Sequence, residues 1–306
     1  MTDNSSYKSR SSFIAGIFDH VMFSKKDIGE NIENGFFEKI IKDVDFYSDE
    51  IVVIFTCLRF EIYIFVNTDD KLRKIYDVFL KNKLKILLQE KDIIDRLTHL
   101  CSGELSEITG ELQIREQVIN TFESHLEEKS NLKNIFYLAL KNSDLFRKSN
   151  NFYNNDNYAT IALKIINDSF DKNLKSFMII GAGMISKEFA KACNSLKDKI
   201  NSIVIADIEK KKSKELARIL EIKNIEIIDI QQINIFLNKV DAIFVAAGGK
   251  YKIYGYKDPL FIVDITCPPM LIMENSPRTK IITILDDNFQ KKINQINNSF
   301  NLSRQK

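Results

Sequence analysis

The feature that most constrains the fold is a regular alternation of short apolar runs and helical segments in the second half of the chain. Each run has the length and apolar character of a strand buried on both faces. Strands joined through helices run parallel, so six of them predict an α/β domain, a doubly wound Rossmann-type sheet in the order 3-2-1-4-5-6. The predicted strands are Phe177–Ile180, Ile203–Ala206, Glu226–Ile230, Ala242–Ala246, Phe261–Ile265 and Ile281–Leu285.

A glycine-rich loop follows the first of these strands directly. Gly181 permits a tight turn, and Gly183 lets the backbone approach a pyrophosphate. The N-terminus of the following helix supplies amide donors and the positive end of a dipole. The alternative, a plain tight turn, does not explain why the loop opens a helix within a six-strand alternation. The predicted dinucleotide-binding residues are Gly181, Ala182, Gly183, Met184, Ile185, Ser186 and Asp207, with Ser186 in place of a third glycine.

The residue that discriminates between dinucleotides is Asp207, at the end of the second predicted strand. An acidic side chain there accepts hydrogen bonds from the ribose 2′-hydroxyl, whereas a 2′-phosphate calls for arginine. Taken alone, Asp207 favours NADH. Lys210, Lys211 and Lys212 follow closely and are long enough to reach back, so the choice between NADH and NADPH stays open.

The first half of the chain predicts an α+β domain. An apolar run, Phe13–Phe18, precedes a helical pattern from Ile28 to Ile41 and then a pair of strands, Glu50–Thr56 and a second that begins near Phe60. A polar, Asn-rich stretch, Ser149–Asn157, indicates the connection between domains. Helices are predicted at Asp70–Leu80, Ile93–Leu100, Gly110–Glu127 and between Leu132 and Ser169 on either side of that stretch.

A cysteine lies where the two predicted strands meet. Arg59 stands two residues after Cys57; a nearby cation favours the thiolate over the thiol, whose ordinary pKa is about 8.5. The planar fork of arginine also suits a substrate carboxylate. The alternative is a buried structural cysteine beside a surface arginine. The four cysteines, Cys57, Cys101, Cys193 and Cys267, are far apart, which indicates neither a disulfide framework nor a zinc site, and no metal is expected.

Composition restricts the class of protein. A chain of 306 residues, with 44% hydrophobic and 28% charged residues, is expected to fold as two soluble domains. The N-terminus, Met1–Arg10, is polar and no stretch is apolar enough to span a bilayer, so we expect a cytoplasmic protein without a membrane partner. The net charge of +2 gives no general footprint for nucleic acid, although basic residues crowd the stretch from Lys71 to Lys85, which typically form a solvated helix face.

Four motifs together resemble the glutamyl-tRNA reductases of tetrapyrrole synthesis. The residues Thr56 to Tyr63 read TCLRFEIY, where that family has T-C-N-R-T-E-I-Y. Ser102 to Val118 follow the family's S-G-L-D-S-x-x-x-G-E-P-Q-I-x-x-Q-V. Farther along, Gly181 to Ser186 are similar to G-A-G-E-M-S, and Asp264 to Pro268 to D-I-A-V-P. The order and spacing of the motifs agree from about Phe13 to Phe289.

The resemblance implies a mechanism and partners. Cys57 would attack the ester carbonyl of glutamyl-tRNA to give a thioester, which NADPH would reduce to glutamate-1-semialdehyde. Arg59 would hold the glutamate carboxylate, and the implied pocket residues are Thr56, Ser106, Glu111, Gln113 and Gln117. The semialdehyde aminotransferase is an implied partner. The implied domains are a catalytic domain at 1–150, a Rossmann domain at 151–289 and the start of a spinal helix at 290–306.

Several residues depart from the family pattern. Leu58, Phe60 and Leu105 replace its Asn, Thr and Asp, and Arg96 stands where the family has a histidine; His99, one helical turn away, is the candidate catalytic histidine instead. Because the sequence stops at Lys306, we expect no family-type dimer. Two alternatives stay open: a reductase repurposed for another aminoacyl-tRNA or acyl thioester, and a non-catalytic dinucleotide-binding regulator.

Overall fold

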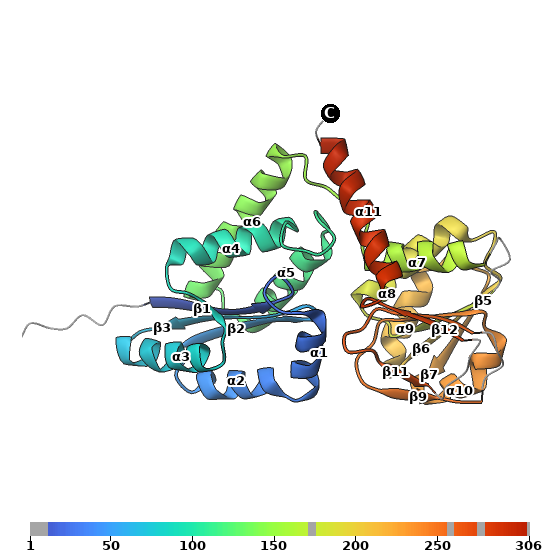
Figure 1. The fold of residues 1–306 in the computed structure, drawn as a ribbon, viewed down its shortest axis with the longest axis horizontal. Coiled ribbons are helices and arrows are strands. Elements are labelled where there is room, and N and C mark those ends of the chain that lie inside the picture. Colours follow the sequence, from blue (N-terminus) through green and yellow to red (C-terminus); the bar gives the residue numbers. More distant parts are fainter. Residues whose placement is uncertain (1–11, 171–175, 256–259, 274–278, 305–306) are drawn as a thin grey trace, which may run out of the picture. The chain divides into compact units, whose positions relative to one another are not determined.

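The computed structural model describes residues 12–170, 176–255, 260–273 and 279–304. The chain divides into two compact units, Met1–Asn154 and Asn155–Lys306 (Figure 1). The polar segment Met1–Arg10 lies outside the described residues. Within the described residues, no helix combines the length and the apolar character that a membrane span needs.

The first unit is built on a four-stranded antiparallel sheet. Its strands are β1 (Ser12–Asp19), β2 (Glu50–Thr56), β3 (Arg59–Val66) and β4 (Lys85–Leu87), in the order β2-β3-β1-β4. The strand pair predicted around Cys57 is the hairpin of β2 and β3. The short strand β4 was not predicted, because three residues are too few to show the alternation of a strand.

Helices cover both faces of this sheet. As a consequence, every residue of β3 is buried. Phe60, Ile62 and Ile64 point into one core, while Tyr63 and Phe65 point into the other. Figure 1 shows the two helical layers. One consists of α1 (Lys25–Glu33), α2 (Phe36–Asp45) and α3 (Asp69–Lys81), and the other of α4 (Glu90–Ser102), α5 (Gln113–His125) and α6 (Asn131–Ser149).

The single helical pattern expected from Ile28 to Ile41 is two helices, so this prediction was wrong in its length. Ser24 caps the first helix with a capping box. Gly35 then adopts φ +66° as the N-cap of the second. A residue in the left-handed region interrupts a helix, and glycine reaches it without steric cost.

The second unit contains the predicted parallel sheet. Its strands are β5 (Ser176–Ile180), β6 (Ser202–Asp207), β7 (Asn224–Asp229), β8 (Ala242–Val245), β10 (Phe261–Asp264) and β12 (Lys280–Thr283). The observed order, β12-β10-β8-β5-β6-β7, is the predicted 3-2-1-4-5-6 read from the opposite edge, so the prediction is confirmed. The switch in strand order lies between β5 and β8, which is where a doubly wound sheet binds its ligand.

Helices and short turns complete the second unit. Phe189 of α8 stacks on Phe244 of β8 with the ring centroids 3.9 Å apart, and α8 thereby covers one face of the sheet. The helices are α7 (Tyr158–Ser169), α8 (Met184–Cys193), α9 (Lys210–Ile219), α10 (Ile233–Phe236) and α11 (Asp287–Arg304), with 3-10 turns at Asn194–Leu196, Ile230–Gln232 and Leu237–Lys239. The parallel pair β9 (Tyr251–Ile253) and β11 (Leu271–Met273) was not predicted, since each strand is only three residues long.

Candidate functional site

The turn of the β2–β3 hairpin carries the candidate nucleophile. Thr56 pairs with Arg59, so Cys57 and Leu58 form the turn between them. The hydroxyl of Thr56 accepts a hydrogen bond from the backbone N–H of Leu58 at 3.3 Å. The backbone N–H of His20 donates to the carbonyl of Leu58 at 3.0 Å. The turn is therefore fixed from two sides, and it presents Cys57 as a half-buried thiol.

Arg59 is fixed under this turn rather than free in solvent. Only 3% of the residue is exposed. Its guanidinium donates to the carboxylate of Glu61 at 3.0 Å and to the carbonyl of Leu105 at 2.8 Å. The second bond ties Arg59 to the loop that carries Ser106. The alternative of a surface arginine beside a structural cysteine therefore does not describe this site.

The carboxylate of Glu61 is the centre of a buried charge network. It accepts hydrogen bonds from Arg59, from Arg96 and from the hydroxyl of Tyr63. Burial alone would raise the pKa of Glu61, but the charges of Arg96 and Arg59 outweigh it and lower the pKa. Arg96 also pairs with Asp19. The arginine at the position of the family histidine thus has a structural role, in which it neutralises two buried carboxylates.

His99, the predicted catalytic histidine, is not brought to this network. Its side chain is 43% exposed, its Nδ1 meets the carboxylate of Glu104, and its ring contacts Phe146 edge-on at 5.8 Å. Three residues along a helix rotate the side-chain direction by about 60° from the starting residue. Because Arg96 points at the sheet, the side chain of His99 lies on a more exposed side of α4.

The other predicted pocket residues are buried to different degrees. Ser106, Glu111 and Gln113 are buried, and Gln117 is half-buried one turn after Gln113 on α5. Burial raises the pKa of the Glu111 carboxyl to about 7, although the Ser106 hydroxyl and the charge of Arg59 partly oppose this rise.

Three of these side chains keep buried polar atoms without partners. Among the described residues, Oγ of Ser106, Oε2 of Glu111 and Nε2 of Gln113 have no hydrogen-bond partner. Buried polar groups without partners are uncommon in folded proteins. Because the charge of Arg59 and the hydroxyl of Ser106 both act on Glu111, these three residues belong to one polar region. Such a region is suited to a polar or charged ligand.

One residue of this region, His20, was missed by the sequence analysis. It follows β1 directly, and its ring interacts electrostatically with Arg59, Glu107, Asp19 and Lys25. In the described structure its Nδ1 is buried and has no hydrogen-bond partner. The only signal in the sequence was the position of His20 at the end of the first apolar run, and the partner strand of that run was unknown.

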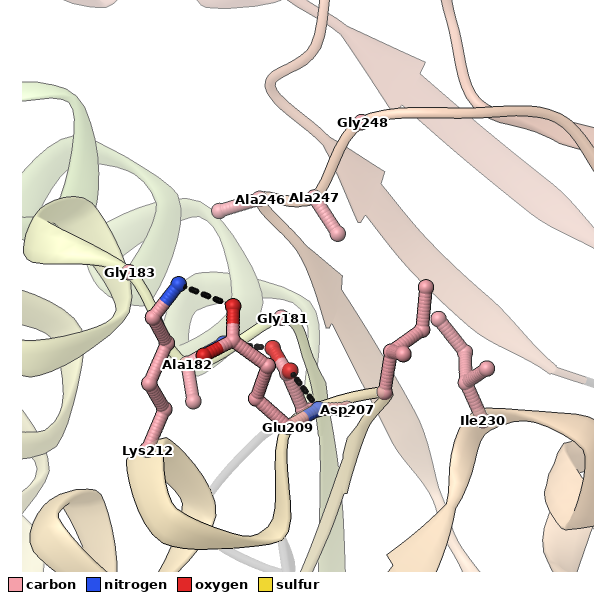
Figure 2. A pocket seen from close by; sticks show the side chains of 11 residues that line it. Gly181, Ala182, Gly183, Asp207, Glu209, Lys212, Ile230, Ala246, Ala247 and Gly248 are labelled. Atoms are coloured by element: carbon pink, nitrogen blue, oxygen red, sulfur yellow. Dashed lines mark hydrogen bonds and ion pairs between the residues drawn. The ribbon is translucent and has the colours of Figure 1, made fainter.

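The predicted glycine loop of the second unit lines a cavity of about 300 Å³, shown in Figure 2. Gly181 has φ +93°, and a Cβ added there would lie 2.6 Å from the carbonyl oxygen of Ala246, so only glycine fits. A Cβ at Gly183 or Gly248 would meet no atom within 4 Å among the described residues. The open space at both glycines is the room that a pyrophosphate needs, so these residues fit a dinucleotide.

The acidic end of β6 closes one side of this cavity. Asp207 accepts the backbone N–H of Ala182 at 2.6 Å and that of Glu209 at 2.7 Å (Figure 2). Lys212 forms an ion pair with Glu209 across the same wall. Of the predicted cofactor residues, Gly181, Ala182, Gly183 and Asp207 line the cavity, whereas Met184, Ile185 and Ser186 form the first turn of α8, and Ser186 is buried.

The parallel sheet, its switch point and the glycine-lined cavity define a Rossmann-type nucleotide-binding domain joined to an α+β domain. Family models agree with this division: residues 15–149 match the N-terminal domain of glutamyl-tRNAGlu reductase, and residues 160–285 match shikimate / quinate 5-dehydrogenase. Residues 15–149 are therefore a domain of the glutamyl-tRNA reductase family.

Curated relatives agree along most of the chain. The glutamyl-tRNA reductase of Sulfurihydrogenibium sp. is 32% identical over 275 residues, which cover 80% of this chain and 60% of that protein. The enzyme of Clostridium botulinum strain Alaska E43 is 25% identical over 260 residues, covering 80% of this chain and 62% of that protein. The chain therefore spans about 60% of the length of these relatives. The solved glutamyl-tRNA reductase of Methanopyrus kandleri matches with a TM-score of 0.41 and 18% identity, covering 95% of this chain and 80% of that one.

Proposed function

We propose that this chain reduces glutamyl-tRNA to glutamate-1-semialdehyde, in tetrapyrrole biosynthesis, through a thioester on Cys57. The observation that carries the proposal is the half-buried thiol on a fixed turn beside buried Arg59, within residues that match the reductase N-terminal domain. A thiolate is a good nucleophile and a good leaving group, and a thioester is easier to reduce than an ester.

In the proposed reaction, the sulfur of Cys57 attacks the ester carbonyl and the ribose oxygen of the tRNA leaves. Arginine has five N–H donors, so Arg59 keeps donors for the substrate carboxylate beyond its bonds to Glu61 and Leu105. The unpaired carboxyl oxygen of Glu111 and the unpaired amide of Gln113 are suited to the polar groups of the glutamyl moiety. Thr56, Ser106 and Gln117 complete the proposed pocket.

The proposed cofactor is a nicotinamide dinucleotide, which supplies the hydride when bound. Gly181 and Gly183 would leave room for its pyrophosphate, and the first N–H groups of α8 would donate to it. Asp207 would accept the adenosine ribose hydroxyls. The open edge of the cavity at Gly248 would receive the rest of the molecule.

A repurposed reductase is the second candidate, and the structure gives a reason to rank it lower. Phe60, one of the departures from the family pattern, lies on the face of β3 opposite Arg59. Its ring stacks on that of Phe37 with the ring centroids 4.6 Å apart. Leu58 is buried. Leu105 packs against the core and offers its carbonyl to Arg59. These substitutions therefore fill the interior, which accounts for them without a changed substrate.

The test uses purified protein and glutamyl-tRNA with a labelled glutamyl group. Without dinucleotide, we expect acid-stable label on Cys57 by peptide mapping, and no label in Cys57→Ser. Cys101, Cys193 and Cys267 are buried and serve as internal controls in the same digest. With NADPH or NADH, the label should appear as semialdehyde. Thioester without turnover would favour the repurposed reductase, and no thioester at all would overturn the proposal.

A further inference from the structure

The residue with the least explained position in the first unit is His20. Asp19 and Arg59 are opposite each other in the β1–β3 ladder, and His20 continues that ladder with its bond to the carbonyl of Leu58. Its backbone is thereby held against the two-residue turn whose other member is Cys57. Neither of the other two histidines has such a position: His99 is partly exposed and meets Glu104, and His125 ends α5 as an exposed residue.

The ring of His20 is set among charges rather than in an apolar core. Four charged side chains from different parts of the unit act on it: Arg59 from β3, Asp19 from β1, Lys25 from α1 and Glu107 from the loop after α4. Lys25 and Glu107 form an ion pair with each other. Since Nδ1 of His20 is buried without a hydrogen-bond partner in the described structure, a polar site is left over for a reacting group.

The charge state of this imidazole follows from its surroundings. Burial lowers the pKa of His20, Arg59 lowers it further and Lys25 adds to the effect, whereas Glu107 and Asp19 oppose them. The net direction is downward from an ordinary value of 6.5. At neutral pH the ring is therefore mostly uncharged, and a neutral imidazole is able to accept a proton.

We infer that His20 accepts the thiol proton of Cys57 and passes it to the ribose oxygen of the departing tRNA, an inference that rests on the proposed function. The sulfur–carbon bond forms as the S–H bond gives its proton to the imidazole. The carbon–oxygen bond of the ester then breaks, and the imidazolium returns the proton to the oxygen that leaves. The products are the enzyme thioester, a tRNA with a free hydroxyl and the neutral histidine, so atoms and charges balance.

The first test needs no tRNA. The rate of Cys57 alkylation by iodoacetamide is measured from about pH 5.5 to 9 in the unmodified protein, in His20→Gln and in the control His125→Gln. We expect alkylation at pH 7 to fall about tenfold in His20→Gln alone, because a positioned base contributes at least this much to a proton transfer. Unchanged alkylation in His20→Gln would overturn the inference.

The second test concerns the ester. Thioester formation from glutamyl-tRNA should fall about 100-fold in His20→Gln and recover in part when imidazole is added to His20→Ala. Thermal unfolding and dinucleotide binding report whether each variant is folded. If the unmodified protein forms no thioester, the proposed function fails, and the alkylation profile alone decides the role of His20. A normal rate of thioester formation in folded His20→Gln would refute that role.

Discussion

The guanidinium of Arg59 and the carboxylate of Glu61 lie 3.0 Å apart on the same face of β3, where both are buried. Alternate residues of a strand share a face, so the T-C-x-R-x-E spacing itself places these two groups side by side. Arg96 from α4 completes the neutralisation. The arginine beside Cys57 is consequently held by a buried carboxylate whose charge Arg96 and Arg59 stabilise together.

We predict that Glu61→Gln strongly destabilises the first unit. The change leaves Arg59 and Arg96 buried beside a neutral amide, and removal of one partner of a buried ion pair costs about 3 to 5 kcal/mol. The measurement is the free energy of unfolding in urea. Glu30→Gln, which removes the exposed partner of Lys26, is the control and should cost less than about 0.5 kcal/mol. Equal effects of the two changes would show that the network is not neutralised as described.

Glu111 should make stability depend on pH. Its pKa is raised in the folded state from an ordinary 4.5 to about 7. A raised pKa stabilises the protonated folded form, so this contribution is complete below pH 4.5 and disappears as the pH rises through 7. The largest loss is about 3 kcal/mol, from the linkage of 1.36 kcal/mol per pKa unit.

The check compares urea midpoints at pH 5 and pH 8. In Glu111→Gln, which cannot ionise, we expect this component of the pH dependence to vanish and stability at pH 8 to exceed that of the unmodified protein. Glu116→Gln, an exposed neighbour at the start of α5, should behave like the unmodified protein. A pH profile that Glu111→Gln leaves unchanged would contradict the assignment.

Much of the fold was predictable because its signals are local. Each strand of the parallel sheet is a compact apolar run, and the position of Gly181 after β5 fixes which end of the sheet binds ligand. The divided helix at Gly35 and the three-residue strands were missed, since a few residues carry too weak a periodicity.

The candidate site was less predictable because its contacts are distant in sequence. Arg96 meets Asp19 across 77 positions and Glu61 across 35. The pairing of β1 with β3 brings His20 to the turn of Cys57, and no local pattern encodes that pairing. His99 on α4 stays a prediction from the family pattern, whereas the position of His20 beside the turn of Cys57 is visible only from the strand pairing.

Alanine at the two glycines of the nucleotide loop should affect different properties, stability at Gly181 and dinucleotide binding at Gly183. In Gly181→Ala, the new methyl group would lie 2.6 Å from a backbone oxygen at a residue with φ +93°, so we expect a loss of at least about 2 kcal/mol in stability. The methyl group of Gly183→Ala would meet no atom of the described protein, so the free energy of unfolding should stay the same. Its methyl group would project toward the cavity and weaken dinucleotide binding about tenfold, or about 1.4 kcal/mol. Unfolding curves and fluorescence titration separate the two outcomes, and tight dinucleotide binding by Gly183→Ala would place the pyrophosphate elsewhere.

Cofactor preference is the prediction on which the family pattern and the residues disagree. The resemblance implies NADPH, but Asp207 would place a carboxylate near the adenosine 2′ position, where a phosphate is repelled. Two unit charges about 4 Å apart at an effective dielectric near 20 interact by roughly 4 kcal/mol, so even a strongly screened contact is able to reverse a preference. Lys212, the nearest compensating cation on the cavity wall, is already paired with Glu209.

We therefore expect NADH to bind at least as tightly as NADPH, and Asp207→Asn combined with Ile208→Arg to shift the preference toward NADPH. Titration by nicotinamide fluorescence checks both statements. Lys197→Gln, which follows the C-terminal end of α8 and removes the partner of Glu221, is the surface-charge control. Tenfold tighter binding of NADPH by the unmodified protein would mean that the lysines from Lys210 to Lys212 dominate over Asp207.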